Sequence, residues 1–126
     1  MKTARIAILA LLPLVAVAAF GQVTLSATLT GGAGLDPDGS GFAVTTFTGT
    51  QLKYTLLAQR IAAPTAAHIH RASDGTVAVD LAATFVGGLA TGTVAVANQA
   101  LADAITGNPS DYYVNVHNAE FPNGAI

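Results

Sequence analysis

Three histidines, all that the 126-residue chain contains, fall in two short segments whose spacing suits metal binding. Two of them stand two residues apart in the segment Ala66-Ala67-His68-Ile69-His70-Arg71. An extended strand sends alternate side chains to opposite faces, so both imidazoles share one face and Ile69 takes the other. Because imidazole is the commonest protein ligand for transition metals, this His-x-His strand is a candidate half of a metal site.

The third histidine lies in a second alternating segment, Tyr112-Tyr113-Val114-Asn115-Val116-His117-Asn118. Alternation places Val114 and Val116 on an apolar face and His117 on the opposite face. If this strand lies beside the first, three neutral imidazoles converge, a set that suits Cu(II), Zn(II) or Ni(II) with water in an open position. We therefore predict His68, His70 and His117 as metal ligands.

A metal-ligating imidazole needs a second group to hold its other ring nitrogen. Asn115, Tyr113 and Glu120 are the nearest candidates in the sequence. The alternative is that the histidines hydrogen-bond groups at the sheet surface and organise the sheets without an ion.

The remaining composition removes several kinds of chemistry. No cysteine is present, which excludes disulfides, thiolate catalysis and cysteine-ligated metals. The serines lack a nucleophile-elbow context, and the acids are scattered singly over predicted loops and strand ends. We predict no catalytic residue from these patterns.

The N-terminus has the layout of a secretory signal peptide. Two basic residues precede the uncharged apolar residues 6–20, and small residues follow. Fifteen residues are fewer than the roughly 20 that a membrane-spanning helix needs. We predict a signal peptide over 1–21 and a mature domain over 22–126, secreted or held in the periplasm or cell envelope; cleavage after Ala18 fits equally well, and an uncleaved anchor is the alternative.

The predicted mature domain is acidic. Beyond Gly21, three basic residues stand against seven acidic ones, a net charge of −4. Nucleic-acid binding and a polybasic membrane surface both need clustered Lys and Arg, so neither is expected. We also expect no integral membrane segment after leader removal, and a protein partner remains open.

Alternation of apolar and polar residues predicts about seven short strands. One segment, 99–106, has helical spacing instead, with Asn98 able to cap its start and Gly107 its end. Several short strands with Gly-rich turns are typical of an antiparallel β-sandwich, here with one short helix. The strands are expected at 23–30, 42–48, 51–58, 66–71, 76–81, 91–97 and 112–118, and the second and third of them as a hairpin.

Several segments together resemble the CHRD domain, a family named for chordin, where it is repeated, and found singly in bacterial secreted proteins. They are Leu25-Ser26-Ala27-Thr28-Leu29-Thr30-Gly31, Leu52-Lys53-Tyr54, Ala66-Ala67-His68-Ile69-His70, Val77-Ala78-Val79-Asp80-Leu81, Tyr113-Val114-Asn115-Val116-His117 and Pro122-Asn123-Gly124-Ala125-Ile126. The resemblance covers nearly all of the predicted mature chain. Residues 32–37 replace the family's Gln-Glu-Val-Pro-Pro-like stretch, and Ala125 stands at the Glu of its closing Gly-Glu-Ile-Arg-Gly.

The resemblance implies an immunoglobulin-like sandwich, more distantly similar to copper-zinc superoxide dismutase, whose copper-binding strand also carries His-x-His. On that likeness His68 and His70 match the paired ligands, His117 is a third, and copper is favoured, with zinc as the alternative. No histidine remains for that enzyme's bridging and zinc-site residues. The function expected is therefore a non-catalytic, secreted binding module with a copper-type site. A protein-interaction module with structural histidines is the alternative, and a small oxidoreductase a third possibility.

Overall fold

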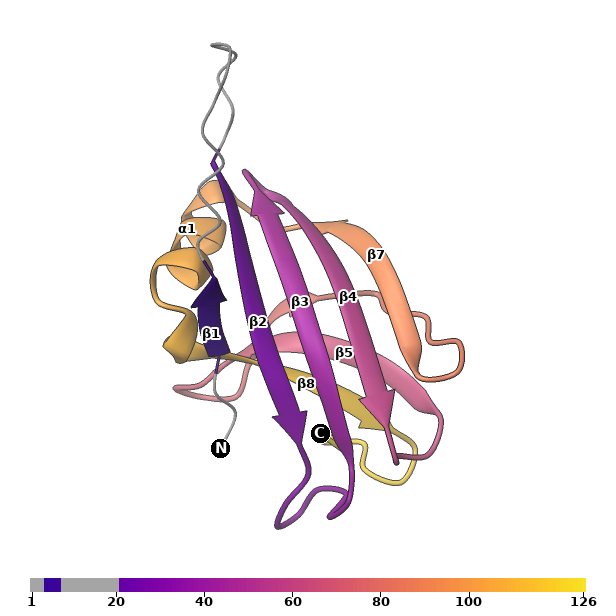
Figure 1. The fold of residues 1–126 in the computed structure, drawn as a ribbon. Coiled ribbons are helices and arrows are strands. Elements are labelled where there is room, and N and C mark those ends of the chain that lie inside the picture. The colour runs from indigo at the N-terminus through magenta and orange to yellow at the C-terminus, as the bar shows by residue number, and fades with distance from the viewer. Residues whose placement is uncertain (1–3, 8–20) are drawn as a thin grey trace.

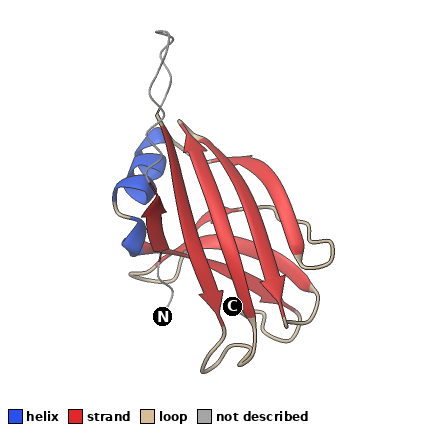
Figure 2. Ribbon diagram, in the orientation of Figure 1, coloured by secondary structure: helices blue, strands red, loops and turns tan. Residues whose placement is uncertain are grey.

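Two antiparallel sheets face each other in the computed structural model, which describes residues 4–7 and 21–126 (Figure 1). The larger sheet has the order β1-β2-β3-β4-β7, formed by Ala4–Ala7, Gln22–Thr30, Ser40–Thr48, Gln51–Gln59 and Leu89–Ala95. The smaller sheet has the order β6-β5-β8, formed by Val77–Asp80, Pro64–Arg71 and Tyr112–Asn118. The predicted all-β antiparallel sandwich with one short α-helix is confirmed for the described residues, which also contain a single 3₁₀ turn. Figure 2 shows that strands make up most of the fold.

The strands form where apolar and polar residues alternate. In β4 every second residue is buried, from Leu52 to Ala58, and the residues between them are exposed. The β3–β4 pair is the predicted hairpin, with Ser40 opposite Gln59 and Thr48 opposite Gln51. Gly49 adopts a φ of 57° in the connecting turn, a left-handed conformation that glycine tolerates without steric cost.

The core lies between the inner faces of the two sheets. Its largest fully buried apolar side chains come from both sheets, from the residue after β6, from the short helix and from the chain end: Leu29, Leu52, Leu56, Leu81, Ile105, Val116 and Ile126. On the smaller sheet the inner face holds Ala67, Ile69 and Val116, as alternation in the two histidine-bearing strands predicts. The histidines therefore lie on the opposite, outer face of this sheet.

The short helix α1 (Gln99–Gly107) packs on the core through Ala102 and Ile105. Asn98 caps its start as predicted: its Oδ1 accepts a hydrogen bond from the Leu101 N–H at 2.9 Å. The prediction that Gly107 caps its end is wrong, because Gly107 is the last helical residue and the cap is Asn108, which donates its N–H to the Ala104 carbonyl. The 3₁₀ turn η1 (Pro109–Asp111) then leads directly into β8.

The chain end pairs with β8 on the side away from β5. The Val116 N–H donates to the Ile126 carbonyl at 2.8 Å, and the Ala125 N–H donates to the Val116 carbonyl at 2.7 Å. Residues 124–126 are buried, and Ile126 is inaccessible to solvent. Both edges of the strand that carries His117 therefore have backbone partners, which fixes that strand in place.

Part of the predicted leader is described. Ala4–Ala7 forms β1, which pairs antiparallel with β2, with Ala4 opposite Ala27. The rest of the predicted leader, 1–3 and 8–20, lies outside the described residues. In the part of the chain that is described, no helix has both the length and the apolar character needed to cross a membrane.

Candidate metal centre

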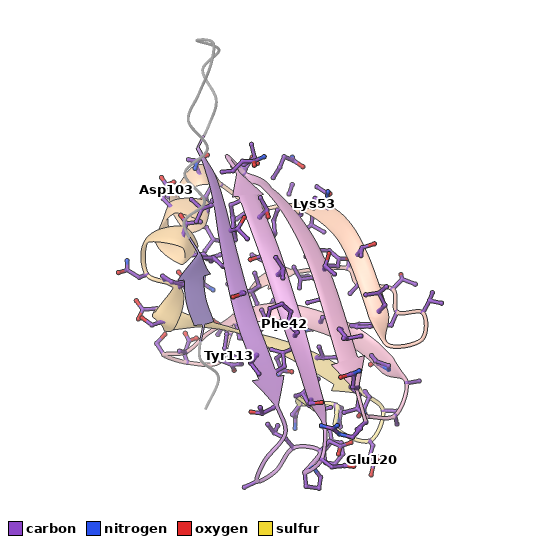
Figure 3. All side chains as sticks on the ribbon, viewed as in Figure 1. Phe42, Lys53, Asp103, Tyr113 and Glu120 are labelled. Carbon is purple, nitrogen blue, oxygen red and sulfur yellow. The ribbon has the colours of Figure 1, made fainter. Side chains whose placement is uncertain are left out.

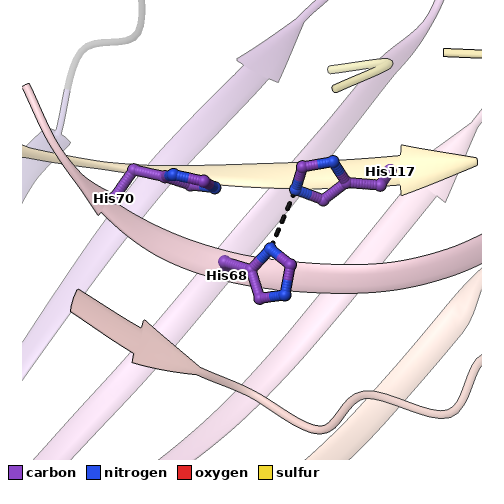
Figure 4. Close-up of side chains that lie close together, drawn as sticks. All are labelled: His68, His70 and His117. Carbon is purple, nitrogen blue, oxygen red and sulfur yellow. Dashed lines mark hydrogen bonds between the residues drawn. The ribbon is translucent and has the colours of Figure 1, made fainter. Parts of the chain in front are cut away.

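The pairing of β5 with β8 brings the three histidines together, as Figure 4 shows. In the register, His68 lies opposite Asn115 and Ala66 opposite His117. Residues directly opposite in adjacent strands point to the same face, so the rings of His68, His70 and His117 lie on one surface. The strand adjacency on which the predicted site depends is therefore present, although the histidines are 47 or more residues apart across the pair.

The distances between ring nitrogens suit one metal ion. His68 Nδ1 and His117 Nε2 are 2.9 Å apart, and one nitrogen from each of the three rings lies within 4.8 Å of the others. Nitrogens bound about 2.0–2.1 Å from one ion lie about 2.9 Å apart at right angles and about 4.1 Å apart in trans positions. The three rings thus need to shift by no more than about 1 Å to enclose an ion.

The cluster is mostly shielded but opens on one side. His70 and His117 are each 9% exposed, whereas the His68 side chain is 21% exposed. The two more buried rings lie beneath the turns that follow their strands, because each bonds to a carbonyl in such a turn. The more exposed His68 marks the side from which an ion or a small ligand can enter.

Backbone carbonyls fix the orientation of the two buried rings. His70 Nδ1 donates to the Gly75 carbonyl at 2.8 Å, and His117 Nδ1 donates to the Pro122 carbonyl at 2.9 Å. Since a carbonyl only accepts, the hydrogen of each neutral ring is on Nδ1 and each Nε2 carries a lone pair. This is the arrangement by which metal-ligating histidines are usually held.

One of these lone pairs is buried without a partner. His70 Nε2 is shielded from solvent and has no hydrogen-bond partner in the structure. Leaving a buried acceptor unsatisfied costs about 1–3 kcal/mol, and such groups are rare in folded proteins. A cation bound at this nitrogen would remove that cost.

The environment of His68 favours its neutral form. Burial lowers the pKa of His68, Asp80 opposes this effect, and His70 adds a smaller lowering. His68 Nε2 lies 3.8 Å from an Asp80 carboxylate oxygen, and its Nδ1 faces His117 Nε2. Neutral imidazole is the form that binds metal. For His68 Nδ1 to bind an ion, the single proton of this ring would move from Nδ1 to Nε2, the nitrogen beside Asp80.

A short polar turn positions the Gly75 carbonyl. The Asp74 carboxylate accepts from the Thr76 N–H at 2.9 Å and from the Thr76 hydroxyl at 2.7 Å. These hydrogen bonds lower the pKa of Asp74, and Gly75 adopts a φ of 72°. The turn closes back onto β5 through the Gly75 N–H, which donates to the Arg71 carbonyl. The ring of His70 therefore depends on a turn whose sequence, Ser-Asp-Gly-Thr, specifies its own geometry.

The predicted supporting groups are partly wrong. Asn115, Tyr113 and Glu120 are not the groups that hold the Nδ1 atoms of His70 and His117, because backbone carbonyls do so. Tyr113 instead stacks on His70, with ring centroids 5.2 Å apart and planes 9° from parallel. Asp80, which sequence reasoning missed, is the charged group beside His68. Each carbonyl lies in a turn five residues after its histidine, but a turn sequence does not show which carbonyl faces a ring.

Gly124 is expected to tolerate no side chain. It adopts a φ of 129°, and a Cβ atom there would overlap the Asn115 amide. We expect Gly124→Ala to lower the free energy of unfolding by about 1–3 kcal/mol, measured by urea denaturation. The matched control is Gly32→Ala, where a Cβ would meet nothing within 4 Å. Equal stability of the two variants would contradict the described packing of Asn115.

The fold and the cluster define a class of protein: a two-sheet antiparallel sandwich with three histidines on the outer face of its smaller sheet. A family model described as the CHRD domain matches residues 25–126. The chain belongs to the CHRD domain family, which confirms the resemblance read from the sequence. Comparisons with curated proteins and with solved structures found no match. Membership of this family supports a binding module.

Proposed function

We propose that this protein is an exported, non-catalytic binding module that holds a transition-metal ion at His68, His70 and His117. The observation that carries the proposal is the buried Nε2 of His70, which has no hydrogen-bond partner. If the histidines were purely structural, this nitrogen should accept a hydrogen bond, whereas a metal ligand keeps its lone pair for the ion. The fixed tautomers of His70 and His117 support it, because each places its lone pair on Nε2; the lone pair of His117 now accepts a hydrogen bond from His68 Nδ1, which a bound ion would replace.

Copper is the ion that this donor set fits best. Three imidazoles without thiolate suit Cu(II), which also has the highest affinity of the divalent first-row metals for nitrogen sites. The 2.9 Å between His68 Nδ1 and His117 Nε2 is the length of the hydrogen bond that joins the two rings, and two adjacent nitrogens on a tetragonal ion would stand at the same separation. A tetrahedral Zn(II) would need about 3.3–3.4 Å between each pair of nitrogens, so the rings would have to move apart. Zinc is the alternative ion.

The three histidines and Asp80 would have different roles in binding the ion. His70 and His117 are held by carbonyls and would form a fixed pair, whereas the more exposed His68 would close on the ion after it enters. A bound ion would supply Lewis acidity at an open coordination position, where a small ligand could attach. Asp80 would receive the remaining N–H of His68 and offset part of the charge.

A second function, a protein-interaction module with purely structural histidines, is supported by family membership and by the hydrogen bond that already joins His68 to His117. It predicts no metal uptake. A small oxidoreductase would instead show turnover that depends on metal and is lost in His117→Ala; a fully metallated but inactive protein would dismiss it.

Export is part of the proposal, with residues 1–21 as the cleaved leader and 22–126 as the mature domain in the periplasm, envelope or medium. The layout of basic, apolar and small residues supports it. Mass spectrometry of the protein recovered outside the cytoplasm should give a chain that starts at Gln22. A chain that retains residues 1–21 would favour the uncleaved anchor.

The test is calorimetric titration of the metal-free protein with Cu(II) and separately with Zn(II). We expect one ion per chain, with tighter binding of copper, and loss of that binding in His68→Ala. Absence of binding at micromolar concentrations, or binding that His68→Ala leaves unchanged, would remove the metal site and leave the interaction module.

Asp80→Asn is expected to weaken copper binding by about tenfold, the lower end of the effect of residues that support a ligand. The effect should be small because Asp80 is 69% exposed in its side chain and 3.8 Å from His68. Competition with a chelator of known affinity measures it, with Asp103→Asn on α1 as the control. An affinity equal to that of the control would show that Asp80 does not support His68.

A further inference from the structure

A second buried polar atom without a partner lies on the strand that carries His117. In the part of the chain that the structure describes, two buried side-chain atoms have no hydrogen-bond partner, His70 Nε2 and Asn115 Oδ1. The first carries a lone pair, and an amide oxygen is likewise an acceptor only. Two acceptors cannot bond to each other, whereas a cation between them would satisfy both.

The pairing of β5 with β8 places Asn115 in the middle of the histidine cluster. Asn115 lies directly opposite His68, so the two side chains share the outer face. On β8 it stands between His117 and Tyr113, and Tyr113 lies opposite His70. Figure 4 shows the rings of His70 and His117 extending toward each other along β8, with His68 beside them. Asn115 is 5% exposed, less than any of the three rings, as expected for a side chain beneath the position where the rings converge.

The chain end holds the Asn115 amide in place. Gly124 adopts a φ of 129° and packs so closely on this side chain that an added Cβ would overlap both the amide nitrogen and the amide oxygen. The next two residues, Ala125 and Ile126, hydrogen-bond to Val116 of β8, so this contact is part of the fold. The amide oxygen is therefore both positioned by the backbone and shielded from water.

No carboxylate of the described residues takes this place. The side chains whose ligand atoms lie close enough together for one ion are the three histidines, without an Asp or Glu. Glu120 lies beyond the end of β8, away from Tyr113 near the start of that strand (Figure 3). Asp80 lies beside His68 Nε2, the ring nitrogen on the far side from His117. Of the amide and carboxylate side chains, the strand register leaves Asn115 to supply an oxygen to the ion.

We propose that Asn115 Oδ1 is the fourth protein ligand of the ion, an inference that rests on the metal site proposed above. Some copper sites take an amide oxygen as a weak axial ligand. With three imidazoles around the ion and Asn115 on the side of the sheet, the open coordination position faces solvent, on the side of His68. The bound ion then satisfies His70 Nε2 and Asn115 Oδ1 together, whereas purely structural histidines leave both without a partner.

Asn115→Leu is the test variant, because leucine has nearly the shape of asparagine but no acceptor. We expect it to lower the affinity for Cu(II) about tenfold in competition titration against a chelator, since an axial oxygen is a weak ligand. The control is Asn108→Leu, an exposed residue whose side chain makes no capping hydrogen bond, which should bind copper as the wild type does. Far-ultraviolet circular dichroism shows whether the variants are folded; Asn115→Ala replaces Asn115→Leu if it is not.

Pulsed electron paramagnetic resonance tests direct ligation. The protein is labelled with asparagine carrying ¹³C at Cγ and loaded with Cu(II). We expect a coupling between the copper electron spin and the labelled carbon in the wild type and in Asn108→Leu, and its loss in Asn115→Leu.

Two results would overturn the proposal, and they differ in what they leave. Copper held by three imidazoles without the carbon coupling, or with a coupling that persists in Asn115→Leu, would keep the metal site and remove Asn115 from it. A wild-type protein that takes up no copper would remove the metal site and this ligand together.

Discussion

His117→Ala is expected to lower the affinity for Cu(II) on the order of 100-fold or more, which exceeds the effect of losing a supporting residue. The substitution removes the nitrogen that lies 2.9 Å from His68 Nδ1 and leaves two imidazoles, both from β5. It also leaves the Pro122 carbonyl without the Nδ1–H donor that it now has. Competition titration against a chelator measures the change.

The matched control for this variant is Thr93→Ala, an equally simple truncation on the exposed face of β7, which should bind copper as the wild type does. Circular dichroism should show that His117→Ala keeps its strands, because its own strand is held by β5 and by the chain end. A loss of affinity below about threefold would mean that His117 is not a ligand.

Ile126→Ala is expected to lower the free energy of unfolding by about 2–5 kcal/mol. The side chain of Ile126 is fully buried, and its methyl groups lie against the backbone of Gly39 and Gly41, where an added Cβ would stand 2.6 Å and 2.9 Å from them. Truncation leaves a cavity between the strand that carries His117 and the start of β3 with the loop before it. Urea denaturation followed by circular dichroism measures the loss.

Val86→Ala is the control, because Val86 is apolar but 79% exposed, and surface changes of this kind stay within about 0.5 kcal/mol. Should Ile126→Ala prove no more destabilising than Val86→Ala, the described packing of the chain end would be wrong. Copper binding by the folded fraction of Ile126→Ala should persist, since the variant removes no ligand.

The strands and their faces were predictable because a period of two is a local property of the sequence. Ile69 and Val116 could be assigned to the core, and His68, His70 and His117 to the outer face, from alternation alone. The likeness to copper-zinc superoxide dismutase added only that His117 could be a third ligand, and the adjacency of the two histidine-bearing strands stayed a condition until the structure showed it. The start of α1 was also predictable, because an Asn that caps a helix is a local signal.

What could not be predicted depends on contacts between distant or backbone groups. The Gly75 and Pro122 carbonyls belong to turns whose direction follows from the fold, and any residue type supplies a carbonyl. Asp80 reaches His68 only because β6 pairs with β5. The pairing of Ala125 and Ile126 with β8 has no alternating pattern long enough to reveal it.

X-ray absorption spectroscopy of the copper-loaded protein tests the central claim most directly, because it identifies and counts the ligands of the bound ion. The account predicts three imidazole nitrogens about 2.0 Å from copper, with the remaining scattering from oxygen, and the loss of one imidazole in His70→Ala. Copper held by one imidazole or by none, or a spectrum that His70→Ala leaves unchanged, would contradict it.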